Sequence, residues 1–249
     1  MKFGRSLFRV TILLCTIFGA LTNFLKLWMR SGSHLSEADR ANWLHGRCKI
    51  ALQRLGIELI VTGTMPQRGL IVSNHLSYLD ILLFSAVQPC IFVSKSEVRS
   101  WPVLGTLASL GGTIYVDRER RSRTPRVRGE MEAVLQEGIP VILFPEGTSS
   151  DGSSVLPFRS ALFEPAVRLN MQVTPACISY TLEDGSVAMD VCYWGDMTLV
   201  PHLCKLLSKG KITGRIRISG RPAIYSSRKE AAMLARVEVA GQVVPPRMA

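Results

Sequence analysis

Residues 71–80 read IVSNHLSYLD, an apolar run that stops at a cluster of polar side chains. Two later stretches repeat this pattern, because residues 112–118 read GTIYVDR and residues 141–148 read VILFPEGT. A short β-branched run that ends in polar or turn-forming residues is typical of a buried strand. Ligands of α/β sheets bind beyond the carboxyl ends of the strands. We therefore expect the three polar clusters to converge at one edge of a sheet.

From residue 57 onward, short apolar runs alternate with helical patterns. This alternation predicts an α/β domain over residues 57–249, with a mixed, partly parallel sheet flanked by helices. We expect strands at residues 57–62, 69–73, 90–94, 113–117, 140–144, 172–180, 187–193 and 212–219. Helices are expected at residues 78–87, 102–110, 124–137, 159–168, 199–208 and 227–240.

Residues 1–56 are predicted to form a membrane-binding pair of helices ahead of this domain. Residues 7–29 read LFRVTILLCTIFGALTNFLKLWM, in which only Arg9 and Lys26 are charged. The uncharged part is shorter than the roughly 20 apolar residues that span a bilayer, unless both cations extend to the head groups. The second helix is expected to begin at Ser36, a good N-cap, and to end near residue 55.

Three interpretations of the apolar N-terminal run remain open. Basic residues on both of its sides suit a helix that lies in, or dips into, one anionic leaflet. A signal peptide would explain the basic start and the apolar middle, although a small-residue cleavage site is missing after the run. A plain core helix is the third alternative.

Composition limits the classes of partner. The chain has 249 residues, with 30 Lys and Arg against 19 Asp and Glu, so its formal net charge is +11. This excess points to an acidic partner, which is a nucleic acid, an anionic lipid surface or a phosphorylated small molecule. Neither dinucleotide-binding nor P-loop glycine patterns occur, and the four histidines do not cluster, so we expect no metal and no cofactor.

His75 and Asp80 carry the first indication of chemistry. Their spacing of five residues would place them about 140° apart on a continuous helix. If His75 instead lies in the turn before the helix, the carboxylate can reach the ring. An aspartate bonded to one ring nitrogen makes the other nitrogen a better base. A capped helix start with a satisfied histidine is the structural alternative.

Four motifs together resemble the 1-acylglycerol-3-phosphate (lysophosphatidic acid) acyltransferase family of glycerolipid acyltransferases. They are NHLSYLD at 74–80, GTIYVDR at 112–118, FPEGT at 144–148 and VTPACI at 173–178, in the order of the family. The resemblance implies transfer of a fatty acyl group from coenzyme A or acyl carrier protein to a lysophospholipid acceptor, with phosphatidic acid as the product.

The resemblance also implies roles for individual residues. His75 would remove the proton from the acceptor hydroxyl, and Asp80 would orient His75. Backbone donors at the start of the helix after His75 would stabilise the oxyanion. Arg118 would hold the anionic head group of the acceptor, and Glu146 would bind its polar groups or order the turn. The expected substrate-binding residues are Asn74, Ser77, Arg118, Glu146, Gly147 and Thr148.

Two positions depart from the family pattern. Many relatives have arginine after FPEGT, where this chain has Ser149, and lysine-glycine where it has Arg159 and Ser160. These changes leave the phosphate preference open. The run from FPEGT to residue 163 also resembles bacterial acyltransferases that acylate lyso-ornithine lipids, which makes that lysolipid the alternative acceptor.

Six arginines between residues 118 and 128 border the expected site. They would bind the phosphates of coenzyme A, the acidic surface of acyl carrier protein, or anionic lipids. A basic lipid- or nucleic-acid-binding protein without catalysis is the remote alternative, and we expect no nucleic-acid partner because interleaved aromatic residues are missing. The expected location is the cytoplasmic face of the inner membrane of a bacterium.

Overall fold

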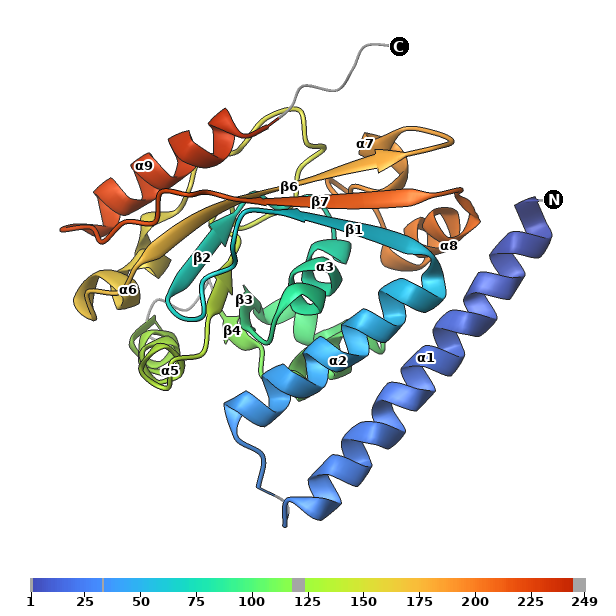
Figure 1. The fold of residues 1–249 in the computed structure, drawn as a ribbon. Helices are drawn as coiled ribbons and strands as arrows, with labels where there is room; N and C mark the ends of the chain where they lie inside the picture. Colours follow the sequence, from blue (N-terminus) through green and yellow to red (C-terminus); the bar gives the residue numbers. More distant parts are fainter. Residues whose placement is uncertain (1, 33, 118–123, 244–249) are drawn as a thin grey trace.

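The computed structural model describes residues 2–32, 34–117 and 124–243. In these ranges, seven strands form one sheet in the order β1-β7-β6-β2-β5-β3-β4, and helices pack on both of its faces (Figure 1). Every strand pair is parallel except β6 and β7. The predicted mixed, partly parallel sheet is therefore confirmed. Its strands are β1 (Ile57–Thr62), β2 (Leu70–Ser73), β3 (Ile91–Lys95), β4 (Ile114–Val116), β5 (Val141–Leu143), β6 (Val173–Leu182) and β7 (Ile212–Ile218).

Helices and short helical turns connect these strands. In chain order they are α1 (Lys2–Arg30), α2 (Glu37–Leu55), α3 (Leu79–Val87), the 3₁₀ turn η1 (Ser96–Ser100), α4 (Leu104–Leu110), α5 (Thr124–Gln136), the 3₁₀ turn η3 (Ser160–Phe163), α6 (Glu164–Arg168), α7 (Val187–Asp190), α8 (Leu199–Ser208) and α9 (Arg228–Gly241).

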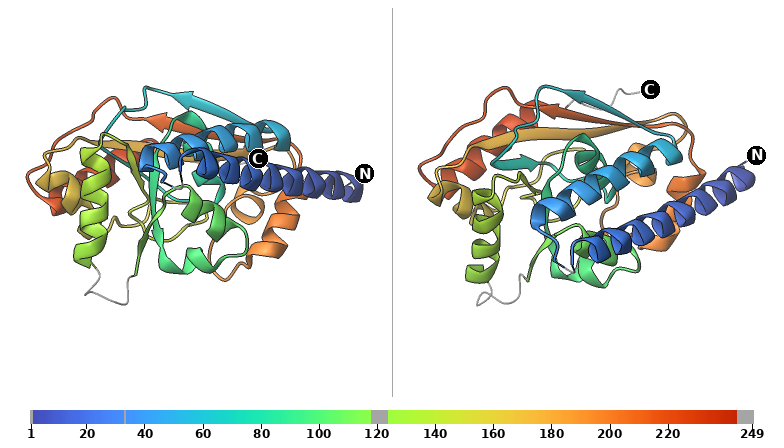
Figure 2. Two further views of the ribbon diagram at one scale, coloured as in Figure 1. Left: turned by 90° about the horizontal axis from the view of Figure 1, so that it is seen from below. Right: turned by 60° about the horizontal axis from the view of Figure 1, so that its bottom comes forward.

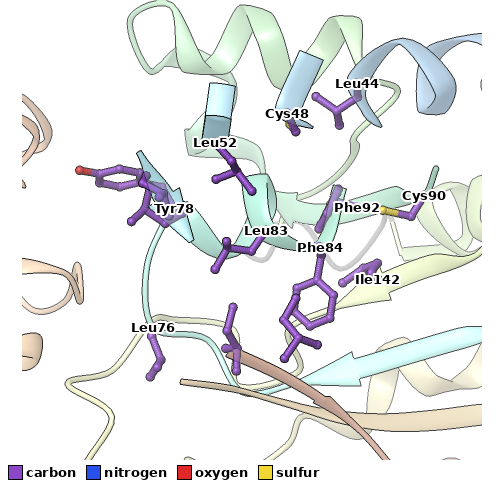
Figure 3. Close-up of a cluster of buried hydrophobic side chains, with 14 of the residues drawn as sticks. Leu44, Cys48, Leu52, Leu76, Tyr78, Leu83, Phe84, Cys90, Phe92 and Ile142 are labelled. Carbon is purple, nitrogen blue, oxygen red and sulfur yellow. The ribbon is translucent and has the colours of Figure 1, made fainter. Parts of the chain in front are cut away.

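The two faces of the sheet belong to separate apolar cores. In β2, Ile71 joins the core beneath α2 and α3, whereas Leu70 and Val72 join the core beneath α5 and α9. In β5, Ile142 likewise faces the first core. Side chains of a strand alternate between its faces, and both faces of β2 and β5 are covered, so these two strands consist mostly of apolar residues. Figure 3 shows Leu44, Cys48 and Leu52 of α2 directed towards this first core.

The first two helices lie side by side and turn back at the end remote from the N-terminus (Figures 1 and 2). The capping box of α2 is complete, because the Ser36 side chain accepts from the backbone N–H of Asp39 and the Asp39 carboxylate accepts from Ser36. Gly56 ends the helix in the left-handed conformation, with φ of 67°. Local signals therefore account for both ends of α2.

One face of α1 is apolar and exposed. Phe24 packs against Trp43 of α2, with ring centroids 5.0 Å apart, and Arg9 donates to the carbonyl oxygen of Lys209 at 2.6 Å. The segment Ser6–Arg30 is long and apolar enough to cross a membrane. Only 17% of its most apolar 18-residue stretch is buried in the protein, which argues against a core helix. The large apolar side chains of this helix that are more than half exposed are Leu7, Phe8, Leu14, Phe18, Leu25 and Met29.

Three expected elements differ in the structure. The strand expected at 187–193 is wrong: residues 187–190 form α7, because Ser186 caps this helix and the Asp190 carboxylate accepts from the Ser186 backbone. The helix expected at 159–168 divides into η3 and α6. The helix expected from residue 102 begins at Leu104, because Val103 has a φ of 64°.

Candidate active site

His75 and Asp80 form the centre of the site. His75 lies in the turn between β2 and α3, and Asp80 lies in the first turn of α3. His75 Nδ1 is 2.7 Å from Asp80 Oδ2, and the side chains are 21% and 0% exposed, respectively. The carboxylate therefore reaches the ring in the way that the sequence predicts, with the histidine before the helix.

The Asp80 carboxylate is surrounded by donors. Its Oδ2 accepts from the backbone N–H groups of Leu76 at 2.7 Å and Ser77 at 3.1 Å. Its Oδ1 accepts from the Tyr180 hydroxyl at 2.5 Å. Burial raises the pKa of Tyr180 well above its usual range, and the Asp80 charge adds to this effect, so Tyr180 stays protonated as a donor. The backbone N–H groups of Leu76 and Ser77 donate to Asp80 and are therefore not available to an oxyanion. The expectation that backbone donors after His75 stabilise the oxyanion is wrong for these two groups.

The FPEGT turn packs against His75. The Phe144 ring stacks on the His75 ring with centroids 4.3 Å apart. The Ser150 backbone N–H donates to the His75 carbonyl oxygen at 3.0 Å. Gly147 turns the chain with a φ of 74°, and its N–H donates to the Phe144 carbonyl at 3.0 Å. Residues other than glycine rarely adopt this φ, which explains why glycine occupies position 147. Two motifs that are distant in sequence thus form one wall.

A cavity of about 300 Å³ opens at this wall. His75 lines it together with Gly147 and Thr148, and Lys95 at the end of β3 is a further lining residue. The cavity therefore lies beyond the carboxyl ends of the parallel strands, as the sequence predicts. Most of its remaining wall is apolar or aromatic: Tyr78, Ile81, Phe92, Val93, Val98, Trp101, Val116, Leu143, Phe144, Leu162, Tyr193 and Trp194. Such a lining suits an aliphatic chain beside a few polar groups.

Glu146 is buried behind this wall. Its side chain is 3% exposed. Neither carboxyl oxygen makes a hydrogen bond of good geometry with the described residues, but the backbone N–H groups of His75 and Leu156 lie close enough to lower its pKa. The pKa of Glu146 is raised to about 8, mainly by burial and to a smaller extent by the nearby Asp80 charge. The carboxyl group is therefore mostly protonated at neutral pH, and it does not line the cavity.

Two other predicted substrate-binding residues, Asn74 and Ser77, lie away from the cavity. The Asn74 amide donates to the Ile178 carbonyl and accepts from the Ile178 N–H, both at 2.9 Å. Ser77 is fully buried, and its hydroxyl has no partner in the described part of the chain. Neither residue lines the cavity. Asn74 therefore joins the histidine turn to β6. Arg118 lies outside the described residues.

The sequence-based prediction missed Tyr180 and a second buried pair. Ser73 pairs with Ala176 in the parallel β2–β6 ladder, so a residue beyond Ala176 lies beside the histidine turn. A tyrosine at the end of an apolar strand was the available signal. The second pair lies at the cavity, where the Tyr78 hydroxyl is 3.0 Å from His202 Nδ1. His202 Nε2 is 2.9 Å from the Cys192 carbonyl oxygen, so this ring holds Tyr78 in place.

Within the described ranges, no group of three or more His, Cys, Asp or Glu side chains is placed to hold a metal ion. The four cysteines Cys48, Cys90, Cys177 and Cys192 are buried free thiols. Cys204 is exposed.

Comparison with known proteins shows which family has this sequence pattern. A model of the Acyltransferase family matches residues 57–179. A lyso-ornithine lipid O-acyltransferase of Brucella abortus is 41% identical over 210 residues, which cover 78% of this chain and 77% of that protein. The chain belongs to the acyltransferase family. As an acyltransferase, it is an enzyme, and the family expected from its motifs is confirmed.

A further relative of this acyltransferase, and a solved structure of similar fold, carry a different name. A 1-acyl-sn-glycerol-3-phosphate acyltransferase of Neisseria meningitidis is 34% identical over 202 residues, which cover 77% of this chain and 79% of that protein. The crystal structure of the 1-acyl-sn-glycerophosphate acyltransferase of Thermotoga maritima matches with a TM-score of 0.69 and 20% identity, over 98% of this chain and 96% of that one. This likeness shows that the two share a fold.

Proposed function

We propose that this acyltransferase moves a fatty acyl group from a thioester to the hydroxyl of a membrane lysolipid, with His75 as the general base. The supporting observation is the His75–Asp80 pair beside the cavity. Because an ionised carboxylate only accepts hydrogen bonds, Nδ1 of His75 carries the proton. Nε2 is then the acceptor that removes the proton from the lysolipid hydroxyl.

The reaction proceeds by direct attack. The acceptor oxygen bonds to the thioester carbonyl carbon as His75 takes its proton, and the resulting tetrahedral intermediate collapses by breaking the carbon–sulfur bond. His75 then returns the proton to the departing thiolate. Asp80 stabilises the imidazolium in between, as an aspartate does in serine-hydrolase triads. The described lining of the cavity contains no cysteine, which agrees with a mechanism that has no thiol nucleophile.

We assign the oxyanion donor to Thr148. This residue lines the cavity together with His75, is exposed to solvent, and follows the left-handed Gly147. Donors directed at a developing oxyanion stabilise the transition state more than the ground state.

We assign lyso-ornithine lipid as the preferred acceptor. Its ornithine head group carries one carboxylate and one ammonium group, whereas a phosphomonoester carries about −1.5 to −2 charges at pH 7. Where many relatives have arginine, Ser149 lines the cavity, and its hydroxyl donates to the Tyr193 carbonyl. This position therefore offers no guanidinium to a phosphate. The Brucella relative and a Rhizobium meliloti relative, 36% identical over 178 residues, both carry the lyso-ornithine name.

Lysophosphatidic acid, which the motifs first suggest, is the second candidate acceptor. The Neisseria relative carries that name, and Arg118 follows the β4 strand at the position where the family motif has its arginine. Acyl-CoA or acyl-acyl carrier protein would be the donor. The exposed apolar face of α1 would place the cavity at the cytoplasmic surface of the inner membrane, where both donors are made available.

An acyl-transfer assay with the purified full chain tests these assignments. Wild type, His75→Ala and the exposed-histidine control His34→Ala are each given acyl-CoA or acyl-acyl carrier protein, with either lysolipid. We expect loss of turnover only in His75→Ala, and kcat/KM at least about tenfold higher for lyso-ornithine lipid, which corresponds to about 1.4 kcal/mol. Turnover of His75→Ala close to wild type would refute the mechanism, and a preference for lysophosphatidic acid would refute the acceptor.

A further inference from the structure

Arg236 reaches from the C-terminal helix α9 to the loop that follows the FPEGT turn. Its Nη2 donates to the Val155 carbonyl oxygen at 2.8 Å, and its Nε donates to the Leu156 carbonyl oxygen at 3.1 Å. The planar guanidinium thus binds two successive carbonyl groups with a fork that lysine does not have. The helix itself packs against β6 and the turn η3 (Figure 1). Arg236 lies outside residues 57–179, which the family model matches, and it does not line the cavity at His75.

The peptide unit between Val155 and Leu156 connects this arginine to Glu146. The Val155 carbonyl and the Leu156 N–H belong to one planar unit, and in a trans peptide they point in opposite directions. Arg236 holds the carbonyl end. At the other end, burial raises the pKa of Glu146, and the Leu156 N–H opposes this rise from close range. The guanidinium therefore directs the Leu156 N–H at the Glu146 carboxyl group.

Glu146 in turn faces the backbone of the proposed general base. The His75 N–H also opposes the raised pKa of Glu146, which places it beside the carboxyl group. On the other side of the residue, the His75 carbonyl oxygen accepts from the Ser150 N–H at 3.0 Å. Glu146 is almost fully buried, so bulk water has little access to these contacts. The backbone of His75 is therefore held by the segment that contains the FPEGT turn.

We propose that Arg236 is a positioning residue for acyl transfer. It fixes the Leu156 peptide, this peptide fixes the Glu146 carboxyl group, and the carboxyl group fixes the backbone of His75. This role rests on His75 acting as the general base. Asp80 orients the His75 ring, whereas Arg236 sets the backbone from which the ring projects. A misplacement of about 1 Å in a reacting group can cost about a hundredfold in rate, so a remote contact can affect catalysis.

Stabilisation of the fold alone is the competing explanation, and the chain offers a control for it. Val155 packs with Val239 of α9 and with Cys177 of β6, so apolar contacts hold the same loop. Val239→Ala removes part of this packing and leaves the guanidinium in place. It should lower the melting temperature but keep kcat within about twofold of wild type. Lys229→Gln makes the same charge change as Arg236→Gln at an exposed position of the same helix and is the matched charge control.

Steady-state kinetics of the full chain in an uncharged detergent, with an acyl thioester and a lysolipid, give the first readout. Arg236→Gln should lower kcat about tenfold and change both KM values less than about twofold, because charged hydrogen bonds are lost away from the substrate. Arg236→Lys keeps the charge but not the fork, so its kcat should lie between those of wild type and Arg236→Gln. Lys229→Gln should match wild type. Circular dichroism of each variant confirms that it is folded.

The second readout does not depend on turnover. The chain is labelled at its histidine backbone nitrogens for NMR, and the amide peak that disappears in His75→Ala belongs to His75. We expect Arg236→Gln to shift this peak and to leave the peak of the exposed His34 unchanged. Lys229→Gln should leave both peaks in place.

Three outcomes would overturn the proposal. They are a kcat of Arg236→Gln close to wild type, an equal loss of kcat in Val239→Ala, and a His75 amide peak that Arg236→Gln does not shift. Turnover of His75→Ala close to wild type would refute the general base and with it the catalytic part of this proposal, whereas an unshifted amide peak refutes the positioning role alone.

Discussion

Tyr180 donates a hydrogen bond of 2.5 Å to the Asp80 carboxylate across 100 residues of sequence. Tyr180 is in β6 and Asp80 is in α3, so this bond connects the central sheet to the helix that carries the aspartate. Asp80 in turn orients His75. The proposed general base is therefore positioned by a residue from a distant strand and not by its own motif alone.

Tyr180→Phe should lower kcat about tenfold while leaving both KM values nearly unchanged. The substitution removes one of the donors that hold the buried carboxylate, and hydrogen bonds to charged groups contribute about 1.5–3 kcal/mol. Steady-state kinetics with saturating donor and acceptor measure the effect. Tyr225→Phe, outside the cavity lining, is the control. An increase in KM without a change in kcat would contradict a positioning role.

Asn74→Ala should destabilise the fold by about 2–4 kcal/mol, because the Ile178 N–H and carbonyl would both lose their buried partner. For a chain of this size, the melting temperature should fall by roughly 5–15 °C. Thermal unfolding followed by circular dichroism checks this, with the exposed Gln136→Ala as the control. If melting is unchanged and only the acceptor KM rises, Asn74 binds substrate instead.

Glu146 should make stability fall as the pH rises. Its pKa is raised from the usual 4.5 to about 8 in the folded protein, so between these values the folded state binds more protons than the unfolded state. Its contribution is fully present below about pH 4.5 and is lost as the pH passes 8. The melting temperature of wild type should therefore decrease between pH 5.5 and 8.5 more than that of Glu146→Gln. Parallel curves for the two proteins would show that Glu146 is ionised at neutral pH.

Arg9→Gln should loosen α1 from α8. The Arg9 guanidinium donates to the Lys209 carbonyl at 2.6 Å, next to the C-terminus of α8, where a cation also suits the helix dipole. Hydrogen exchange should become faster in residues 6–16 and in α8, while the sheet amides keep their protection. Lys26→Gln, at the other end of α1, is the comparison. Equal exchange in wild type and Arg9→Gln would show that this contact does not hold the helix.

Local patterns in the sequence determined most of the fold. The predicted strand at 57–62 and helix at 199–208 have the bounds of β1 and α8, because apolar periodicity and turn residues act within a few residues of each other. The cap at Ser36 was predictable for the same reason. Where a local signal was overridden, as in residues 187–190, a short-range cap from Ser186 and ion pairs of Asp190 with Lys205 and Lys209 outweighed β-branched propensity.

For the candidate site too, the sequence and the tertiary structure each determined a different part. The sequence by itself determined which chemical groups are present, since His75, Asp80, Gly147 and Thr148 are read from motifs whose internal spacing is local. Only the tertiary structure decided which groups meet: Asn74 bonds to Ile178, Tyr180 to Asp80, and Phe144 stacks on His75. Strand order and register bring these residues together, and neither is encoded by the residues that flank them. The motifs therefore specify the chemical groups of the acyltransferase site, whereas the positions of these groups depend on the packed sheet.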